Sequence, residues 1–546
     1  MKKQITLITL IIFSIFANAQ TSIALDTINT NTVWADTIFL NSNVYIENGV
    51  QLKIKPGAVV IANDWYGIDC QGQILAQGTE QDSIKFTVAD TTNFFDIYKT
   101  LGGWRGLNFD STLATNDSSL IDFCILEYGK TADTSNYNIK SDGGAIFCNY
   151  FNKLIISNST FKNNYSQGTG GAICLKYSTI IIYNNLFNNN WSIDRGAGIF
   201  IFEKSKTLVK ENVFLNGRAG KKDSWLPPGE GIIYQAAGSA ICVSNSSNYF
   251  DDNGVIIINN KFYNNNSTNG TIYISSIYSN IANNILCNNN GTVIFASNGG
   301  FWYYTKMVFT NNVIVNNSFD IGLDNRIVFL SDHVNFYNNI VIANLNNTNN
   351  PDSLISVLSW YSSPIFSPHS YIKYNYLSQQ TPTDGEGNIY GTTPLFVNPS
   401  PNTDFVANWQ DYDWRLQVTS PCINAGTTDT NGLELPEQDA FGNPRIFGGR
   451  VDIGAYENQT EVWNNVFSLE NKLELTYYPN PVRNSLQLKI NNVQLQKQDL
   501  QIFDINGKLV KQIAINNEAI TIDVSDLETG VYYLRLGGLS KEFIKY

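Results

Sequence analysis

The sequence predicts an all-β protein: a right-handed parallel β-helix followed by a small C-terminal β-sandwich of immunoglobulin-like type. The main observation is a box of the form Asn-x-Phe-x-Asn-Asn, or a close variant, that recurs along the middle of the chain. Its central apolar residues are separated by 26, 27, 48, 24, 28 and 27 residues, at Phe161, Phe187, Phe214, Phe262, Leu286, Ile314 and Val341. Self-similarity at a period of about 20 to 50 residues indicates a solenoid, whose repeats bury their apolar faces only against their neighbours.

A second box, rich in glycine, precedes the first in four repeats, at 143–147, 170–174, 196–200 and 238–242. Between the boxes lie Gly, Asn, Ser and short β-branched runs, which are typical of strands between turns. The repeats lack the 3.6-residue apolar period that the helix of a leucine-rich repeat would need. Propeller blades require about 40 residues each. A parallel β-helix with two or three short strands per coil therefore remains.

The asparagines have a structural explanation in such a fold. Coils stack at about 4.8 Å, so equivalent residues form ladders. Asn tolerates the left-handed conformation of a tight corner, and its amide can bond the Asn above and below, while the Phe of the box points inward. Aligning the glycine boxes places four residues on one rung: Phe147, Cys174, Phe200 and Cys242. The two cysteines are therefore predicted to be small core residues, with Cys148 facing the other way.

Residues 1–19 have the pattern of a secretory signal peptide. A basic start and an apolar run from Ile5 to Phe16 precede an A-x-A pattern, which predicts cleavage between Ala19 and Gln20. No later apolar run approaches the roughly 20 residues that span a bilayer, so no transmembrane segment is expected in the mature chain. Removing two lysines with the signal changes the net charge from −12 to −14. Such an acidic surface argues against nucleic acid or anionic lipid as a partner.

Residues 20–100 are predicted to form N-terminal capping coils, with strands around Ile46–Gly57 and Ile74–Thr79. These coils would cover the open edge of the solenoid, which otherwise invites edge-to-edge pairing. The parallel β-helix repeats are expected over 101–370.

Residues 371–457 are predicted to form the C-terminal end segment of the β-helix. They contain Ser420-Pro421-Cys422-Ile423-Asn424-Ala425-Gly426, then Asp439-Ala440-Phe441-Gly442-Asn443-Pro444-Arg445, then Val451-Asp452-Ile453-Gly454-Ala455-Tyr456-Glu457. These motifs resemble the closing segment of the choice-of-anchor Q family of surface β-helix proteins, whose members carry different C-terminal anchors. Two interpretations of the ionisable residues stay open: a catalytic carboxylate cluster, or a structural set in which Arg445 pairs with a carboxylate. The intervening turn-forming Gly and Pro favour the structural one.

After a linker at 458–475, residues 476–546 have the pattern of a small all-β module. Tyr478-Pro479-Asn480-Pro481-Val482 precedes alternating strands, Asn506-Gly507 suits a hairpin turn, and Gly530 lies before the last strand pair. The module resembles the type A C-terminal sorting domain of the type IX secretion system of Bacteroidetes. The resemblance implies contact with that secretion machinery, export of the folded protein to the outer cell surface or beyond, and later removal of the module.

Functional residues are expected on loops of this rigid scaffold. The doubled step of 48 residues contains an insertion from Gly217 to Gln235. The catalytic candidates are few, because the repeats are poor in charge: Asp194, Arg195, Lys221, Lys222, Asp251 and Asp252. The ligand-binding candidates are aromatic residues that could stack on sugar rings if their loops share one face: Trp225, Trp191, Trp302 and Tyr303. The structural alternative is a solvated loop with Trp225 packed onto the coil edge.

These observations favour an exported, non-catalytic protein that binds an extracellular polysaccharide or a host or cell-surface glycan, as an adhesin does. The alternative is a polysaccharide lyase or glycoside hydrolase that acts on acidic polysaccharide from a pectate-lyase-like solenoid, although fold alone does not imply function. A lyase would need a Lys or Arg base and carboxylates that hold Ca²⁺, and a hydrolase a carboxylate pair. No other cofactor or metal is expected, since the two histidines and seven cysteines form no recognisable motif, and the cysteines are predicted to be buried free thiols, apart from an alternative Cys124–Cys148 pair.

Overall fold

The structure is a computed structural model. It describes residues 21–546 except 97–98, 132–140, 204, 221–235, 245–253, 277, 298–305, 319–326, 331–333, 343, 345–354, 358–370, 379–384, 402–405, 407, 461–473, 492–498, 506, 516, 518 and 537–538.

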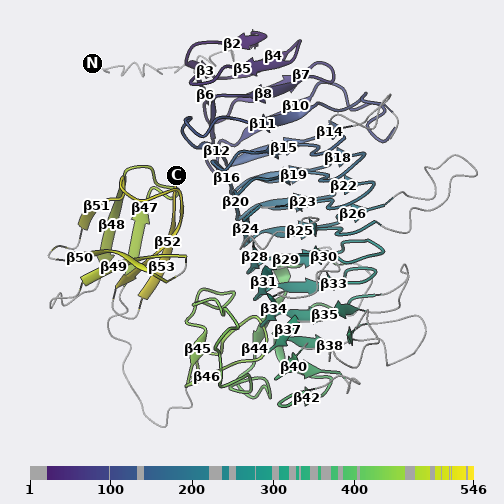
Figure 1. Ribbon diagram of the computed structural model, residues 1–546, viewed down its shortest axis with the longest axis vertical. Helices are drawn as coiled ribbons and strands as arrows, with labels where there is room; N and C mark the ends of the chain where they lie inside the picture. The colour runs from purple at the N-terminus through teal and green to yellow at the C-terminus, as the bar shows by residue number, and fades with distance from the viewer. Residues whose placement is uncertain are drawn as a thin grey trace, which may run out of the picture.

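Three long parallel sheets run the length of the molecule and form a right-handed parallel β-helix (Figure 1). In the described residues, sheet A has 14 strands, from β1 (Thr21–Ile23) to β42 (Ile389–Tyr390). Sheet B has 12 strands, from β2 (Thr27–Ile28) to β39 (Ile355–Val357). Sheet C also has 12, from β3 (Thr32–Trp34) to β40 (Tyr371–Lys373). The predicted fold class is confirmed.

Each coil visits the three sheets in turn. A representative coil contains β15 (Ile146–Asn149) in sheet B, β16 (Leu154–Ser157) in sheet C and β17 (Thr160–Lys162) in sheet A. In four coils of the described part of the chain, a further two-residue strand such as β18 (Tyr165–Ser166) forms a short fourth sheet at the corner between sheets A and B. The strands between residues 20 and 100 belong to the same three sheets, so the predicted capping coils are the first coils of the solenoid itself.

The phenylalanines of the repeated box point inward and stack along the axis, as predicted. Phe161 and Phe187 have ring centroids 5.0 Å apart, Phe187 and Phe214 4.7 Å, and Phe214 and Phe262 4.9 Å. All four side chains are buried in one continuous core. Offset aromatic stacking adds to the free energy gained from burying these rings.

The two asparagines that end each box have separate roles. The first, such as Asn189 with φ of 55°, makes the left-handed turn. The second, such as Asn190, is buried and forms the ladder: its Oδ1 accepts the backbone N–H and the Nδ2 of Asn164 at 3.1 and 3.0 Å. Its own Nδ2 donates to the carbonyl oxygen of Phe161 at 2.9 Å. Because each amide satisfies main-chain groups that the corner leaves unpaired, the ladder lets the backbone turn inside the core.

The predicted rung of Phe147, Cys174, Phe200 and Cys242 is present, but the prediction of the face was wrong. Cys174, Phe200 and Cys242 form a separate cluster on the outer side of sheet B, whereas Cys148 lies in the solenoid core. Alignment sets which residues share a rung, but strand side chains alternate between faces, so it cannot say which face is inner. All seven cysteines are buried and free, as predicted.

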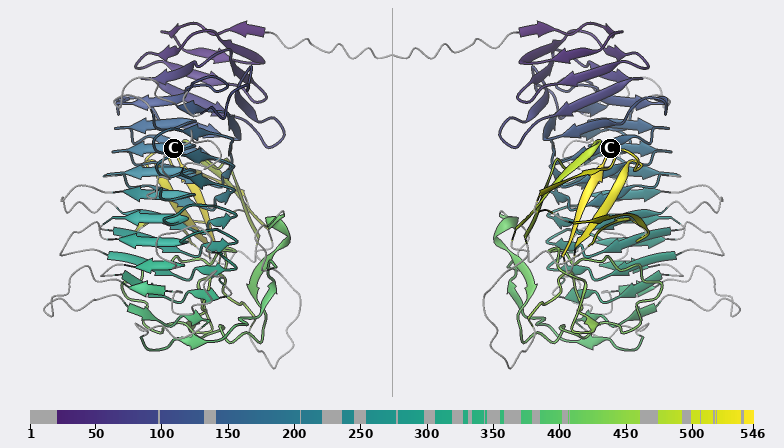
Figure 2. Two further views of the ribbon diagram at one scale, coloured as in Figure 1. Left: turned by 90° about the vertical axis from the view of Figure 1, so that its right-hand side faces the viewer. Right: turned by 90° about the vertical axis from the view of Figure 1, so that its left-hand side faces the viewer.

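Residues after β42 do not simply end the solenoid but return along the outer face of its last coils (Figure 2). This closing segment contains β43 (Phe396–Asn398), β44 (Asp413–Leu416), β45 (Ile446–Phe447) and β46 (Arg450–Val451). Apolar side chains of the segment pack on outward-facing apolar residues of sheet A: Tyr263, Ile285, Cys287, Val313, Val315, Ile340 and Ile342.

Four ionisable residues in the motifs of the closing segment make structural contacts: Asp439, Arg445, Asp452 and Glu457. Arg445 Nη2 lies 2.8 Å from Glu457 Oε2, and both side chains are fully buried. The carboxylate of Asp439 accepts the backbone N–H groups of Phe441, Asn443 and Glu457. The carboxylate of Asp452 accepts those of Asn424 and Asn458. These contacts bear out the structural interpretation, because every carboxylate is committed to the fold of the segment.

The C-terminal module is a sandwich of two antiparallel sheets with its own core. One sheet contains β47 (Glu474–Tyr478), β48 (Ser485–Asn491) and β51 (Ala519–Asp523). The other contains β49 (Asp499–Asp504), β50 (Leu509–Ala514), β52 (Gly530–Leu536) and β53 (Leu539–Lys545). The predicted hairpin joins β49 to β50, with Gly507 at φ of 77°.

Candidate ligand-binding site

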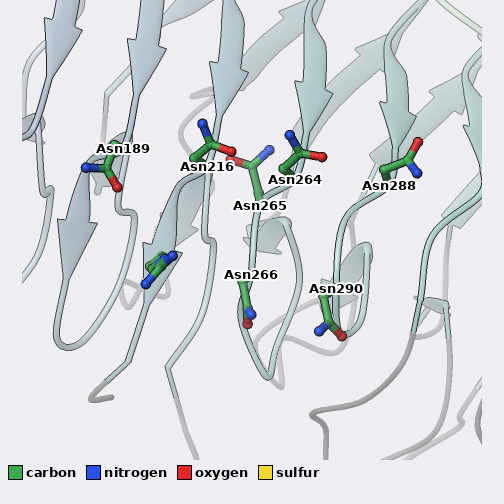
Figure 3. Close-up of a pocket in the computed structure, with 8 residues that line it drawn as sticks. Asn189, Asn216, Asn264, Asn265, Asn266, Asn288 and Asn290 are labelled. Carbon is green, nitrogen blue, oxygen red and sulfur yellow. The ribbon is translucent and has the colours of Figure 1, made fainter. Parts of the chain in front are cut away.

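A pocket of about 390 Å³ lies at the corner where the coils leave sheet A (Figure 3). The turns that build it follow β21 (Leu186–Asn188), β25 (Val213–Leu215), β29 (Lys261–Tyr263) and β32 (Ile285–Cys287). Asparagine dominates its lining, which consists of Asn189, Asn216, Arg218, Asn264, Asn265, Asn266, Asn288 and Asn290.

The repeat itself places these side chains. Asn189, Asn216, Asn264 and Asn288 are the left-handed residues of successive turns, and they lie in one row, one per coil (Figure 3). Asn266 and Asn290 lie two residues further along their turns and form a second row. Because coils stack in register, one residue type repeated at one turn position becomes a polar surface along the axis.

The pocket lies where the residue type in the second row changes from aromatic to polar. In earlier coils this turn position holds Tyr165 and Trp191, whose rings pack 4.7 Å apart and are almost fully buried. The strand pairing then brings Arg218 next to Trp191, and Asn266 and Asn290 follow on the next coils. Long aromatic side chains thus give way to one exposed guanidinium and shorter amides.

The buried ladder is also interrupted at this point. Gly217 occupies the position that holds Asn190 in one neighbouring coil and Asn265 in the other. Its backbone N–H donates to Asn265 Oδ1 at 2.9 Å, so the ladder contact survives on that side. A Cβ at position 217 would lie 2.2 Å from the carbonyl oxygen of Ser239, so a side chain there would force the backbone to shift. The ladder therefore lacks one amide at this coil, although Arg218 and Ala219 still pair in register with the coil before.

The lining offers hydrogen-bonding groups without acid–base chemistry. Asn189 and Asn216 each donate one amide hydrogen to a neighbouring asparagine, at 2.7 and 2.9 Å. Within the described part of the chain, the side-chain amide of Asn266 has no hydrogen-bond partner. Among the lining residues Arg218 carries the one charge, and there is no carboxylate. Amides and a guanidinium can bind hydroxyl and anionic groups but cannot serve as a general acid and base at neutral pH.

The closing segment contacts the same row of asparagines. Asn264 Nδ2 donates to the carbonyl oxygen of Val406 at 2.8 Å, and its Oδ1 accepts the Val406 N–H at 2.9 Å. Ser400 Oγ donates to Asn288 Oδ1 at 3.0 Å. The closing segment thus holds two of the lining side chains, Asn264 and Asn288, in place.

Of the predicted aromatic platform, the structure describes Trp191. Its indole is only 9% exposed, packs on Tyr165 and donates from Nε1 to the carbonyl oxygen of Gly220 at 2.7 Å. This placement argues against the predicted stacking of a sugar on Trp191, because the ring has little free surface. Its contact with Gly220 instead supports the backbone beside the pocket.

Asp194 and Arg195 lie at a different corner, before sheet B, with Oδ1 and Nε 3.3 Å apart. On the preceding coils, Lys176 Nζ contacts Asp142 Oδ2 at 2.7 Å. Burial raises the pKa of the Asp194 carboxyl, and Arg195 offsets this only in part. Burial alone would lower the pKa of Lys176, but its neighbours, including Asp142, leave that pKa raised. Sequence reasoning identified Asp194 and Arg195 but not their neighbours Asp142 and Lys176.

The other predicted site residues lie outside the described residues and remain predictions: Lys221, Lys222, Trp225, Asp251, Asp252, Trp302 and Tyr303, together with Ala19 and Gln20 of the signal. The sequence analysis placed the functional loop at 217–235, and Arg218, near the start of that insertion, lines the pocket. It missed the lining asparagines because they share the scaffold pattern. The available signal was the replacement of a ladder asparagine by Gly217 and the adjacent charge of Arg218.

Over the described residues, no group of three or more His, Cys, Asp or Glu side chains could hold a metal ion. No helix in the same part of the chain is long and apolar enough to cross a membrane.

Comparison with known families adds one assignment. No curated protein matches the chain. Residues 476–545 match the family model described as the secretion system C-terminal sorting domain, which confirms the resemblance inferred from the module's motifs. Such a domain contacts the secretion machinery. The C-terminal module is therefore a sorting domain, and the protein that carries it is directed to the cell surface or the extracellular space.

Proposed function

We propose that this exported protein binds a glycan without chemically altering it, as an adhesin does, and that the asparagine pocket is its contact site. One observation carries the proposal: the lining combines seven amides with one guanidinium and contains no carboxylate. Amides both donate and accept hydrogen bonds, which matches the hydroxyl groups of a sugar. The guanidinium of Arg218 adds a site for a carboxylate or sulfate on the ligand.

The finer expectations belong to the same proposal. The ligand would be an extracellular polysaccharide or a glycan on a host or neighbouring cell. The motifs of the closing segment suggest a relation to the choice-of-anchor Q proteins, and the sorting domain suggests a Bacteroidetes-type bacterium. The signal peptide at 1–19 would provide the first export step.

Binding to a glycan array by the protein from residue 20 onward tests the proposal. Asn216→Gly removes a pocket amide while keeping the left-handed turn, whose φ is 56°. Asn184→Gly is the matched control, since Asn184 has φ of 52° in a turn outside the pocket lining. We expect Asn216→Gly and Asn266→Ala each to weaken retention about 5- to 30-fold, as loss of one or two hydrogen bonds does. Equal retention by the pocket variants and the control would exclude this pocket.

A second candidate, a lyase or hydrolase for acidic polysaccharide, is favoured by the Asp142, Lys176, Asp194 and Arg195 cluster on adjacent coils. The raised pKa of Asp194 would suit a general acid. The raised pKa of Lys176 keeps its amine protonated and opposes a role as the base of an elimination. Incubation with uronate polymers and Ca²⁺ separates the candidates: unsaturated or shortened products that disappear in Asp194→Asn would establish the enzyme.

A further inference from the structure

The C-terminal module packs on the outer face of sheet C over a continuous apolar surface. One outward-facing position is apolar on every coil from β9 (Gln73–Gln77) to β28 (Val255–Ile258). Strand register aligns these residues in one column, called here the sheet C stripe: Leu75, Leu120, Ile155, Ile181, Leu208 and Ile256. The stripe forms a single cluster with Val531, Tyr533, Ile544 and Tyr546 of the module. Figure 2 shows the module over the middle of the solenoid.

The face of the module that contacts the sheet C stripe is also mostly apolar, because alternate residues of β52 and β53 on that side are apolar. Val531 pairs with Ile544 and Tyr533 with Glu542, so all four lie on one side of the β52–β53 pair. The alternate residues Tyr532, Leu534 and Phe543 face the module's own core. Strands with apolar side chains on both faces are usually buried on both faces, here by the module's own core and by sheet C.

A buried ion pair lies within this contact. Lys210 of sheet C pairs with Glu542 of β53, and their side chains are 4% and 12% exposed. Lys210 Nζ also lies 5.8 Å from the ring centroid of Tyr533 and 3.5 Å from Glu211 Oε1. Separating a buried ion pair leaves an uncompensated buried charge. The pair therefore disfavours any other position of the module on sheet C.

Polar contacts surround the apolar centre. Ser118 Oγ and Thr529 Oγ1 are 3.3 Å apart. Asp117 and Arg483 form an exposed ion pair at 2.6 Å. Gln438 of the closing segment donates to the carbonyl oxygen of Ser540 at 3.1 Å. An apolar centre with a polar rim is the usual anatomy of a specific interface.

We propose that the outer face of sheet C is a docking surface for the sorting module and that the docked module acts as a latch. While the latch is closed, the sheet C stripe and the β52–β53 face cover each other. A partner that recognises this face of the module can bind only after the latch opens, whereas the β47–β48–β51 sheet stays accessible. Release of the module uncovers an apolar stripe that soluble monomers rarely leave exposed. The latch lies on a surface separate from the asparagine pocket and does not depend on glycan binding.

Disulfide trapping in the full chain tests the docking. The double variant Ser118→Cys with Thr529→Cys places two thiols at the observed contact, and the native cysteines are buried. The matched control, Ser118→Cys with Thr521→Cys, puts the second thiol on an exposed position of the opposite sheet. We expect mild oxidation to link most of the first variant and at most a few per cent of the control. Equal or absent linkage in the two variants would overturn the docking.

Cleavage at a protease site inserted into the linker, on the N-terminal side of β47, tests the latch. We expect the two pieces of the otherwise native chain to elute together in size-exclusion chromatography. Glu542→Lys should separate them and increase the fluorescence of an apolar dye several-fold, and adding Lys210→Glu should restore co-elution. Arg483→Glu at the exposed rim is the control and should leave the pieces together. Separation of the native pieces, or failure of the reversed pair to restore co-elution, would contradict the latch.

Discussion

At the scale of single residues, the two asparagines of each pair have different roles. The first makes the left-handed turn and the second forms the buried amide ladder, whereas the sequence pattern assigns both roles to asparagine in general. Asn184 makes a left-handed turn at φ of 52° and is exposed. Asn185 is 2% exposed; its Oδ1 accepts the Ser159 N–H at 2.9 Å, and its Nδ2 donates to Ile156 O at 3.0 Å. The turn residue needs tolerance of positive φ, whereas the ladder residue needs its amide.

This division predicts opposite sensitivities at adjacent positions. Asn185→Ala should lower the free energy of unfolding by about 2–3 kcal/mol, because it leaves buried main-chain groups without partners. Asn184→Gly should change it by no more than about 0.5 kcal/mol, since glycine adopts positive φ without strain. Urea titration followed by circular dichroism measures both. Similar losses for the two variants would contradict the assignment.

Gly217 supplies a test in which the repeat pattern and the structure disagree. The pattern suggests that asparagine at position 217 would complete the ladder and stabilise the protein. The structure places a Cβ there 2.2 Å from the backbone oxygen of Ser239. Gly217→Asn should therefore destabilise the protein by about 1–3 kcal/mol, as overpacking does. A higher melting temperature for this variant would show that the backbone can move aside.

At the scale of elements, β14 (Lys130–Thr131) holds the loop between β10 (Ile84–Val88) and β11 (Gly106–Asp110). Lys130 Nζ donates to the carbonyl oxygens of Asn93, Asp96 and Leu101 at 3.1, 2.9 and 2.9 Å. Burial lowers the pKa of Lys130 from 10.5 to about 8.

This shift has a defined consequence for stability. Between pH 8 and pH 10.5 the unfolded chain keeps the Lys130 proton more than the folded chain does, so titration of this group makes the folded state relatively more stable as pH rises. Comparison with Lys130→Met isolates the effect. The difference in unfolding free energy, native minus variant, should grow from pH 7.5 to pH 10.5. A difference that stays constant or shrinks would contradict the lowered pKa.

The closing segment is held by the buried pair of Arg445 and Glu457. Arg445→Met should cost about 3–5 kcal/mol of unfolding free energy, because it leaves the Glu457 carboxylate buried without its counterion. Arg415→Met is the matched control: Arg415 pairs with Asp413 at 2.6 Å, but its side chain is 49% exposed. The control should cost at most about 1 kcal/mol. Thermal denaturation of the two variants checks the contrast.

At the scale of the whole molecule, continuous burial protects every thiol. Burial raises the pKa of Cys148, Cys287 and Cys422 to about 12, and all seven cysteines are buried. We expect the native protein to react negligibly with a thiol reagent at pH 8, and the unfolded protein to expose seven thiols at once. Rapid reaction of one thiol in the native protein would identify a coil that opens locally.

The overall fold and the core were predictable because a solenoid is built from local repetition. The inward Phe161 and Phe187 follow from a box that contacts only the next copy of itself. The face of Cys174 was not predictable, since a rung alignment is the same for either side of a strand. The sequence predicted the closing segment but not its packing on sheet A, nor the docking of the module, because the residues that cover an outward side chain come from far along the chain.

Some long-range packing is nevertheless visible in the sequence, as apolar residues at outward-facing positions of strands. The unbroken run Val255–Ile258 indicates a strand covered on both sides. One outward column of sheet A changes from polar residues in early coils to apolar ones in late coils: Glu127, Lys162 and Asn188, then Cys287, Val315 and Ile342. These changes mark which coils are covered, but they do not name the partner that covers them.

The sequence by itself determined the solenoid, its period, the position of its insertion and the sorting domain, because each depends on neighbouring residues or on adjacent copies of one repeat. Only the tertiary structure decided where the closing segment lies, which side of sheet C the module covers and where the asparagines open into a pocket. Those features arise from contacts between segments that are distant in sequence. A periodic pattern can show that a face is covered, but it does not identify the covering segment, since that depends on surface complementarity between distant parts of the chain.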